Sequence, residues 1–402
     1  MNSQQNRKGR QRNNEWYARF VRDSISHIRE TVGDSKAIVG VSGGVDSTVA
    51  TVLVHRAIGD KLIPVMIDHG LLREGEVELV VSAFSELGIH LRVVDAGARF
   101  LARLKGVADP EEKRKVIGEE FIRVFEDEAA KYGDVRFLVQ GTILSDVVES
   151  GTSVELAVGD SASDIDEDIG EDIGEDTGAH RGKDVGKDAG EDAFEDADED
   201  AGEDTGGDPG DGEDKTEDAG EDTRDAGTPQ LVKSHHNVGG LPEHMDFELL
   251  EPLRELYKEQ VRLVGEALGL PKSLIYRHPF PGPGLAVRVL GEVTKEKLDT
   301  LRKAQAVLDR EILESGWYDN LWQYFCVLPN VRTVGVKDGR RTYGHLIGVR
   351  AVLSSDAMVA KWAPIPHHVL DRIALKITEE IPQVNRVVYD ITSKPPGTIE
   401  WE

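Results

Sequence analysis

Short hydrophobic runs alternate with amphipathic segments over the first third of the chain. The intervening patterns at 45–59 and 76–88 have helical spacing. Four runs have the length and the β-branched residues of strands: AIVGVS (37–42), LIPVMID (62–68), LRVVDA (91–96) and FLVQGT (137–142). This alternation predicts an α/β fold, in which helices cover a parallel sheet. Ligands bind such sheets beyond the carboxyl ends of the strands, where SGGVDS, DHG and GTILSD lie.

The last third of the chain has a different pattern. A predicted helix at 250–270 precedes YRHPFPGPGLAVRVLG (276–291), whose prolines and glycines predict a rigid loop. The elements expected after it are helices at 294–315 and 366–381, a final strand at 386–393, and a β-hairpin with the Asp-Gly pair 338–339 as its turn. We therefore expect an α/β domain at 15–284, followed by a smaller α+β domain at 285–402.

Most of the charge of the chain lies in one segment. The 402 residues carry a net charge of −27, and residues 160–227, with 29 Asp and Glu against 5 Lys and Arg, account for −24 of it. The segment is of low complexity and has few apolar residues, so we expect it to be disordered. The nine-residue repeat of a calcium-binding β-roll is missing. Because the remaining chain is nearly neutral, a role of the segment beyond solvation stays open.

Composition disfavours several classes of protein. Cys326 is the single cysteine, which excludes a disulfide framework and a cysteine-rich metal site, and we expect it in a buried strand. The sequence has neither an apolar run of membrane-spanning length nor a signal-peptide pattern. We therefore expect a cytoplasmic protein with no membrane partner. Residues 1–14 are basic and predicted to be disordered, and such a short basic end is more often solvated than bound to nucleic acid.

The junction SGGVDS (42–47) has the features of a phosphate-binding loop. Gly43 and Gly44 allow a tight turn and a close approach of a ligand to the backbone. The helix that follows directs its N–H groups and the positive end of its dipole toward the same place. Asp46 would repel phosphate unless a magnesium ion lay between them, so it is the candidate metal ligand. GxxxxGKS is missing, so this is no ordinary P-loop, and a plain strand-to-helix turn stays open.

Taken with other motifs, SGGVDS resembles the pyrophosphate loop of the N-type ATP pyrophosphatases, which have an adenine nucleotide alpha hydrolase-like fold. The other motifs are QGTILSDVVES, KSHHNVGGLP, EPLRELYKEQVR, RHPFPGPGLAVRVLG, RTYGHLIGVRAV and NRVVYDITSKPPGTIEWE, which resemble the ATP-pyrophosphatase subunit of the GMP synthase family. The resemblance covers the chain except residues 1–14 and the acidic segment. It implies a carbon–nitrogen ligase that uses ATP and Mg²⁺ to form adenylyl-XMP and pyrophosphate, after which ammonia displaces AMP to give GMP.

The same resemblance implies roles for individual residues. ATP would be bound by Ser42, Gly43, Gly44, Val45, Asp46, Ser47 and Thr48, with Asp46 holding Mg²⁺. A mobile lid, which the acidic segment interrupts, would carry the catalytic residues Asp146, Glu149, Lys233, His235 and His236. XMP would be bound by Arg341, Gln323, Lys394 and Glu400, with Arg277 and Arg288 as further candidates. SHHN alone could be part of a zinc site, but no Cys or acid lies at zinc-ligand spacing.

The resemblance also implies partners. We expect a homodimer through the C-terminal domain. Nothing in the sequence resembles the Cys-His-Glu triad of the glutaminase that bacterial relatives carry, so ammonia would come from free ammonium or from a separate glutaminase subunit.

Three alternatives share the phosphate loop. A tRNA-modifying pyrophosphatase would need sulfur-carrying cysteines and a basic face. An NAD synthetase-like enzyme would lack KSHHN and SKPPGTIEWE. The third alternative is a catalytically dead nucleotide-binding regulator, which the presence of Asp46, Lys233, His235 and Lys394 disfavours.

The acidic segment predicts a salt dependence. A long flexible insertion adds little closure entropy, about 0.6 kcal/mol per doubling of length, so it need not prevent a lid from closing. Its charge of −24 should repel nucleotide unless salt screens it, and the Debye length falls to about 3 Å at 1 M salt. We therefore expect activity to rise between low and molar KCl. Activity that is highest at low salt would contradict this expectation.

Overall fold

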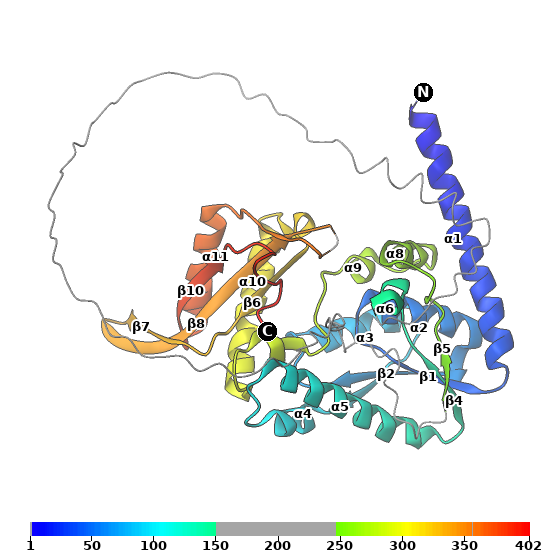
Figure 1. The fold of residues 1–402 in the computed structure, drawn as a ribbon, viewed down its shortest axis with the longest axis horizontal. Helices are drawn as coiled ribbons and strands as arrows, with labels where there is room; N and C mark the ends of the chain where they lie inside the picture. The colour runs from blue at the N-terminus through cyan, green and yellow to red at the C-terminus, as the bar shows by residue number, and fades with distance from the viewer. Residues whose placement is uncertain (1, 150–246, 356) are drawn as a thin grey trace, which may run out of the picture. The chain divides into compact units, whose positions relative to one another are not determined.

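The computed structural model describes residues 2–149, 247–355 and 357–402 (Figure 1). The acidic segment and three predicted lid residues, Lys233, His235 and His236, lie outside the described residues.

The first sheet confirms the predicted α/β fold. Its strands are ordered β3-β2-β1-β4-β5, and every neighbouring pair is parallel. The strands are β1 (Lys36–Gly40), β2 (Leu62–Asp68), β3 (Arg92–Asp95), β4 (Val135–Val139) and β5 (Glu248–Leu250). The strand order reverses direction between β1 and β4, which is where such sheets open a crevice for ligands. SGGVDS follows β1 and GTILSD follows β4, so both lie at this crevice.

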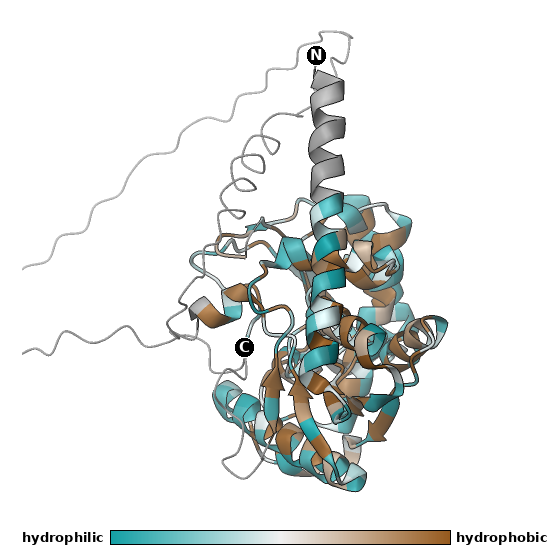
Figure 2. Ribbon diagram, turned by 90° about the vertical axis from the view of Figure 1, so that its right-hand side faces the viewer, coloured by the Kyte–Doolittle hydropathy of each residue, from teal (hydrophilic) through white to brown (hydrophobic). Residues whose placement is uncertain are grey.

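Helices cover both faces of this sheet because alternate residues of each strand point to opposite sides. Ile38 belongs to a hydrophobic cluster with residues of α4 and α5, whereas its neighbours Ala37 and Val39 pack with α1, α2, α3 and α8. Figure 2 shows hydrophobic residues gathered on the strands and hydrophilic residues on much of the coloured part of α1. The helices are α1 (Asn2–Val32), α2 (Val45–Ile58), α3 (Glu76–Glu86), α4 (Gly97–Leu104), α5 (Pro110–Ala129) and α8 (Lys258–Ala267).

A second sheet follows the proline-rich loop, as predicted. Long strand β8 (Arg340–Leu353) pairs with β6 (Gln323–Val327), β7 (Arg332–Lys337) and β9 (Lys361–Trp362) in antiparallel fashion and with β10 (Val384–Asp390) in parallel. Helices α10 (Lys295–Glu314) and α11 (His367–Glu380) pack against it. Asp338 and Gly339 have φ angles of 51° and 71°, which confirms the predicted Asp-Gly turn. Cys326 is fully buried in β6, as expected.

Two predicted elements differ from the structure. The predicted helix at 250–270 begins only at Lys258, because residues 251–256 form turns that bond to the segment after β4, as in the bond from Leu144 N to Leu256 O. Pro252 also has no N–H to give a helix there. At the N-terminus, α1 begins at Asn2 and includes residues for which we predicted disorder. Tyr17, Val21 and Ile28 bury one face of the later turns of α1, and this packing stabilises the helix.

Among the described residues, no helix is both long enough and apolar enough to span a bilayer.

Candidate active site

The phosphate loop joins the central strand β1 to the N-terminus of α2. Ser42 Oγ lies 3.0 Å from Ser47 Oγ and accepts a hydrogen bond from Gly44 N at 3.3 Å. Ser47 Oγ also donates to Gly44 O at 3.2 Å. These bonds close the loop into a tight cradle. The first N–H groups of α2 have no partner inside the helix, so they are directed into the crevice together with the positive end of its dipole.

Two glycines in this region cannot be replaced without moving their neighbours. Gly43 has a φ of +77°, and a Cβ there would lie 2.9 Å from Val80 Cγ2. A Cβ on Gly141, after β4, would lie 2.9 Å from Ser47 N and from the carbonyl carbon of Asp46. The loop after β4 therefore packs directly on the first turn of α2, which brings the two halves of the crevice together.

Asp46 is placed as a metal ligand would be. Its Oδ2 lies 3.1 Å from Lys258 Nζ, whereas its Oδ1 is buried and accepts no hydrogen bond within the described residues. A buried carboxylate oxygen without a donor fits a cation, and Mg²⁺ is commonly held by one carboxylate together with substrate phosphates and water. Over the described ranges, no group of three or more His, Cys, Asp or Glu side chains could hold a metal by itself.

Lys258 is a site residue that the sequence prediction missed. It is the first residue of α8, and it reaches across to α2 from more than 200 positions away. A cation in the first turn of a helix opposes the helix dipole, and this unfavourable placement was the available signal. Lys258 stands beside the one carboxylate of the loop, where it could also neutralise a phosphate chain.

Arg277 lies at the phosphate loop. Its Nη1 donates to Gly43 O at 3.1 Å, and its Nη2 pairs with Glu76. Burial alone would raise the pKa of the Glu76 carboxyl, but the guanidinium groups of Arg73 and Arg277 outweigh burial and lower this pKa below its usual value. Glu76 is therefore ionised, and Arg277 is held against the loop rather than beside the other candidate XMP residues.

Three other candidates come together in a second cluster. Arg288 is 2% exposed and makes two hydrogen bonds with the Glu400 carboxylate, at 2.8 and 3.1 Å. Gln323 Nε2 donates to the same carboxylate at 3.0 Å and to Pro279 O at 3.1 Å. The sequence placed these residues far apart, but the fold gathers them where the proline-rich loop meets the C-terminal segment.

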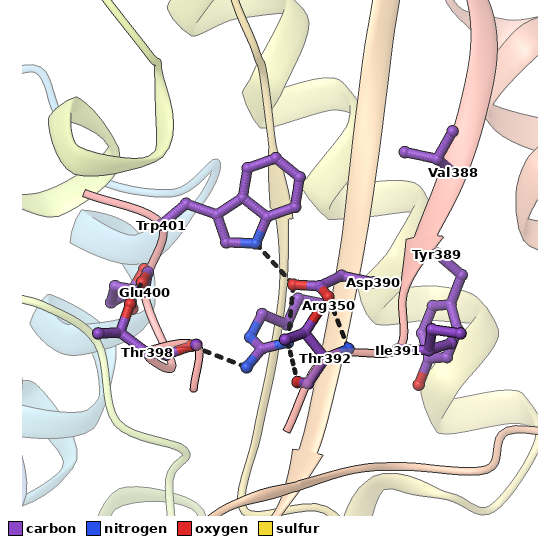
Figure 3. Close-up of a pocket in the computed structure, with 10 residues that line it drawn as sticks. Arg350, Val388, Tyr389, Asp390, Ile391, Thr392, Thr398, Glu400 and Trp401 are labelled. Carbon is purple, nitrogen blue, oxygen red and sulfur yellow. Dashed lines mark hydrogen bonds and ion pairs between the residues drawn. The ribbon is translucent and has the colours of Figure 1, made fainter. Parts of the chain in front are cut away.

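The C-terminal segment is held by buried cations. Arg350 donates to the carbonyl oxygens of Thr398 and Ile399, each at 2.7 Å, and pairs with Asp390 at 2.7 Å. The Trp401 indole N–H also donates to Asp390, at 2.9 Å (Figure 3). A cavity of about 500 Å³ lies here, and its lining includes Arg350, Asp390, Thr398, Glu400 and Trp401. Lys113, on α5, pairs with Glu402.

The remaining candidates lie in or beside the second sheet, in α6 and at the start of α2. Lys394 Nζ donates to Ala357 O at 2.9 Å, and Arg341 is exposed in the β7–β8 hairpin. Asp146 lies in α6 (Leu144–Glu149), where its Oδ2 accepts a hydrogen bond from Ile143 N at 3.1 Å. Glu149 is the last residue of that helix. Of the loop residues, Val45 begins α2, and Thr48 is buried in its first turn.

A parallel sheet with a glycine-rich loop opening a helix at its switch point is typical of nucleotide-binding α/β proteins. The NAD synthase family model matches residues 17–121, and the GMP synthase C-terminal domain model matches residues 310–401. The glutamine-hydrolysing GMP synthases of Halothermothrix orenii and Clostridium tetani are 47% and 48% identical over 96% and 95% of this chain. The chain therefore matches the synthetase part of GMP synthases, and it spans 61% of the length of these curated relatives.

Solved structures were found at lower similarity. The NH₃-dependent NAD synthetase from Campylobacter jejuni is 12% identical with a TM-score of 0.36, over 74% of this chain and 87% of that one. The NMN synthetase from Francisella tularensis is 11% identical with a TM-score of 0.37, over 70% and 84%.

Replacement of Lys258 or Asp46 should weaken binding of Mg·ATP. We expect Lys258→Met to raise the Kd by about tenfold, or about 1.4 kcal/mol, because one charge-assisted contact to phosphate is lost. Asp46→Asn should abolish the magnesium dependence of binding while keeping the shape of the loop. Titration calorimetry with and without Mg²⁺ measures both effects.

The matched control is Lys272→Met, since Lys272 also begins a short helix, α9 (Lys272–Ile275), but is exposed. Equal affinities of the Lys258→Met and Lys272→Met variants would remove Lys258 from the site.

Proposed function

We propose that the chain makes GMP from XMP, ATP and ammonia through an adenylyl-XMP intermediate. The observation that carries the substrate assignment is the similarity to GMP synthases over 96% of the chain, which includes both sheets. The phosphate loop supports the use of ATP independently of that similarity, because it presents helix N–H groups, hydroxyls and Lys258 to one place.

The chemistry has two steps. The oxygen on carbon 2 of XMP attacks the α-phosphorus of ATP, and the bond from that phosphorus to the leaving pyrophosphate breaks. The nitrogen of ammonia then bonds to carbon 2, the carbon–oxygen bond breaks, AMP leaves with the oxygen, and the nitrogen loses a proton. Neither step calls for a covalent enzyme intermediate.

The residues of the chain hold and orient the reactants. The first turn of α2, Ser42 and Ser47 bind the departing pyrophosphate, and Lys258 offsets part of its charge. Magnesium, held through Asp46, would neutralise the phosphate oxygens. Arg288 and Gln323 fix Glu400 at the XMP site, with Lys394 and Arg341 as further candidates for its phosphate. Glu149, Asp146 and the segment with Lys233, His235 and His236 are proposed to close as the lid.

Ammonia is proposed to come from free ammonium or from a separate glutaminase subunit. Cys326, the only cysteine in the sequence, is fully buried, and burial raises the pKa of its thiol. Because the thiolate is the reactive form, Cys326 is no candidate nucleophile for the hydrolysis of glutamine.

A homodimer through residues 285–402 is part of the same proposal, with residues 15–284 as the ATP-pyrophosphatase domain. Val388 and Ile391 on and beside β10, and Trp362 on β9, expose apolar side chains on the second sheet. Such a surface supports contact with a second copy.

The purified chain should form GMP and AMP in a 1:1 ratio from XMP, Mg·ATP and ammonium. Chromatographic measurement of both nucleotides over time checks this ratio, and the variant Asp46→Asn serves as the inactive control. Release of pyrophosphate only with an acceptor other than XMP would contradict the substrate assignment, and nucleotide binding without any turnover would contradict an enzyme.

A further inference from the structure

Glu76 occupies an unusual position between two arginines. It begins α3 and is 7% exposed, and its carboxylate accepts hydrogen bonds from Arg73 Nε at 3.0 Å and from Arg277 Nη2. Arg277 also bonds to the phosphate loop, since its Nη1 donates to Gly43 O at 3.1 Å. A buried carboxylate with two guanidinium partners is strongly oriented, because each N–H···O bond fixes its plane. Glu76 therefore fixes the place of the Gly43 carbonyl.

On its other side, Arg73 reaches the proline-rich loop. Its guanidinium carbon lies 4.8 Å from the centre of the Phe280 ring, within the range of a cation–π contact. Arg288 lies 5.2 Å from the centre of the same ring and holds Glu400. Phe280 is thus shared between an arginine from the phosphate-loop side and an arginine from the proposed XMP side.

These contacts form one continuous path, which we call the guanidinium bridge: Arg277, Glu76, Arg73 and Phe280. It begins at Gly43, in the loop that would hold the pyrophosphate, and ends at Arg288, which holds the proposed XMP residue Glu400. Neither Glu76 nor Arg73 is among the residues proposed to touch ATP or XMP. Glu76 and Arg73 therefore act on the two binding sites only through other residues.

A second contact between the same loops restricts their relative movement. Leu285 N donates to Leu71 O at 2.7 Å, and a Cβ on Gly284 would clash with the same oxygen. His69 supports this segment, since its Nδ1 accepts a bond from Leu71 N at 3.1 Å. Burial lowers the pKa of His69 to about 4, so the ring stays neutral and keeps its acceptor near pH 7. The backbone contact sets the spacing of the loops, and the guanidinium bridge sets their orientation.

We propose that Arg73 and Glu76 are positioning residues that set the orientation of the phosphate loop relative to the XMP site. This inference rests on the proposed function, because it concerns the alignment of the α-phosphorus of ATP with the oxygen on carbon 2 of XMP. In-line attack depends steeply on such alignment, and a misplacement of about 1 Å can lower the rate by about 100-fold. Binding of each substrate alone depends on it far less.

The test replaces the bridge without touching the sites. We expect Arg73→Met and Phe280→Leu each to lower kcat by about 10- to 100-fold while the KM values for ATP and XMP change by less than about threefold. Arg73→Lys should give an intermediate loss, since it keeps the charge beside Glu76 but not the planar group on Phe280. A purely structural role would lower the amount of folded protein and leave the kcat of the folded fraction unchanged.

The matched control is Arg114→Met. Arg114 pairs with Glu111 at the same i,i+3 spacing as Arg73 with Glu76, and its side chain is equally exposed at 19%. Within the described residues its guanidinium bonds to Glu111 on α5 and to neither loop. The control should keep kcat and both KM values. If Arg73→Met folds poorly, Phe280→Leu makes the same measurement, because it removes the ring and keeps the ion pairs.

Hydrogen exchange gives a readout that does not depend on turnover. In Arg73→Met, peptides covering 41–48 and 277–284 should both exchange faster than in the wild type, and in Arg114→Met neither should change. Faster exchange of one peptide alone, or a kcat equal to that of the control, would overturn the inference. If both peptides exchange faster in Arg73→Met but the wild type makes no GMP, the proposed function is overturned, whereas the coupling of the two loops through the guanidinium bridge stands.

Discussion

The close packing of Gly141 on the first turn of α2 is the constraint on which the rest of the site depends. Because β1 and β4 are adjacent and parallel, their carboxyl ends meet at one edge of the sheet. The absence of a side chain at Gly141 lets the loop after β4 approach the backbone of Asp46 and Ser47 closely. That approach brings α8, and with it Lys258, up to the phosphate loop, because residues 250–256 bond to the segment that follows β4.

The charged groups of the phosphate loop and those of the C-terminal segment are arranged differently. Around the phosphate loop, cations stand beside a single candidate metal ligand, so an incoming phosphate chain meets helix N–H groups, Lys258 and an available carboxylate oxygen. Around the C-terminal segment, the buried cations Arg288 and Arg350 are both satisfied by carboxylates and carbonyls. Breaking a buried ion pair of this kind lowers the free energy of unfolding by about 3–5 kcal/mol. These pairs therefore hold the C-terminal segment in a fixed position.

Local patterns were sufficient for most of the fold. The strand β1, the helix α2 and the Asp-Gly turn depend on neighbours in sequence, and all three were predicted at their observed places. The helix predicted from residue 250 begins at Lys258 because tertiary bonds to the β4–α6 segment override its helical pattern.

The site was less predictable because its contacts join distant segments. The loop residues were found because a glycine-rich turn has a local signature. Lys258 and Glu76 were missed because their roles depend on partners 212 and 201 positions away. Arg277 was predicted for XMP from its place in a motif, yet it lies against Gly43.

The most direct test of the central claim is to follow the oxygen on carbon 2 of XMP. If adenylyl-XMP forms, XMP labelled with ¹⁸O at carbon 2 should yield AMP that carries one ¹⁸O and GMP that carries none at that carbon, as seen by mass spectrometry. Unlabelled AMP, with the label released into water or found in pyrophosphate, would contradict activation of that oxygen by the α-phosphorus of ATP.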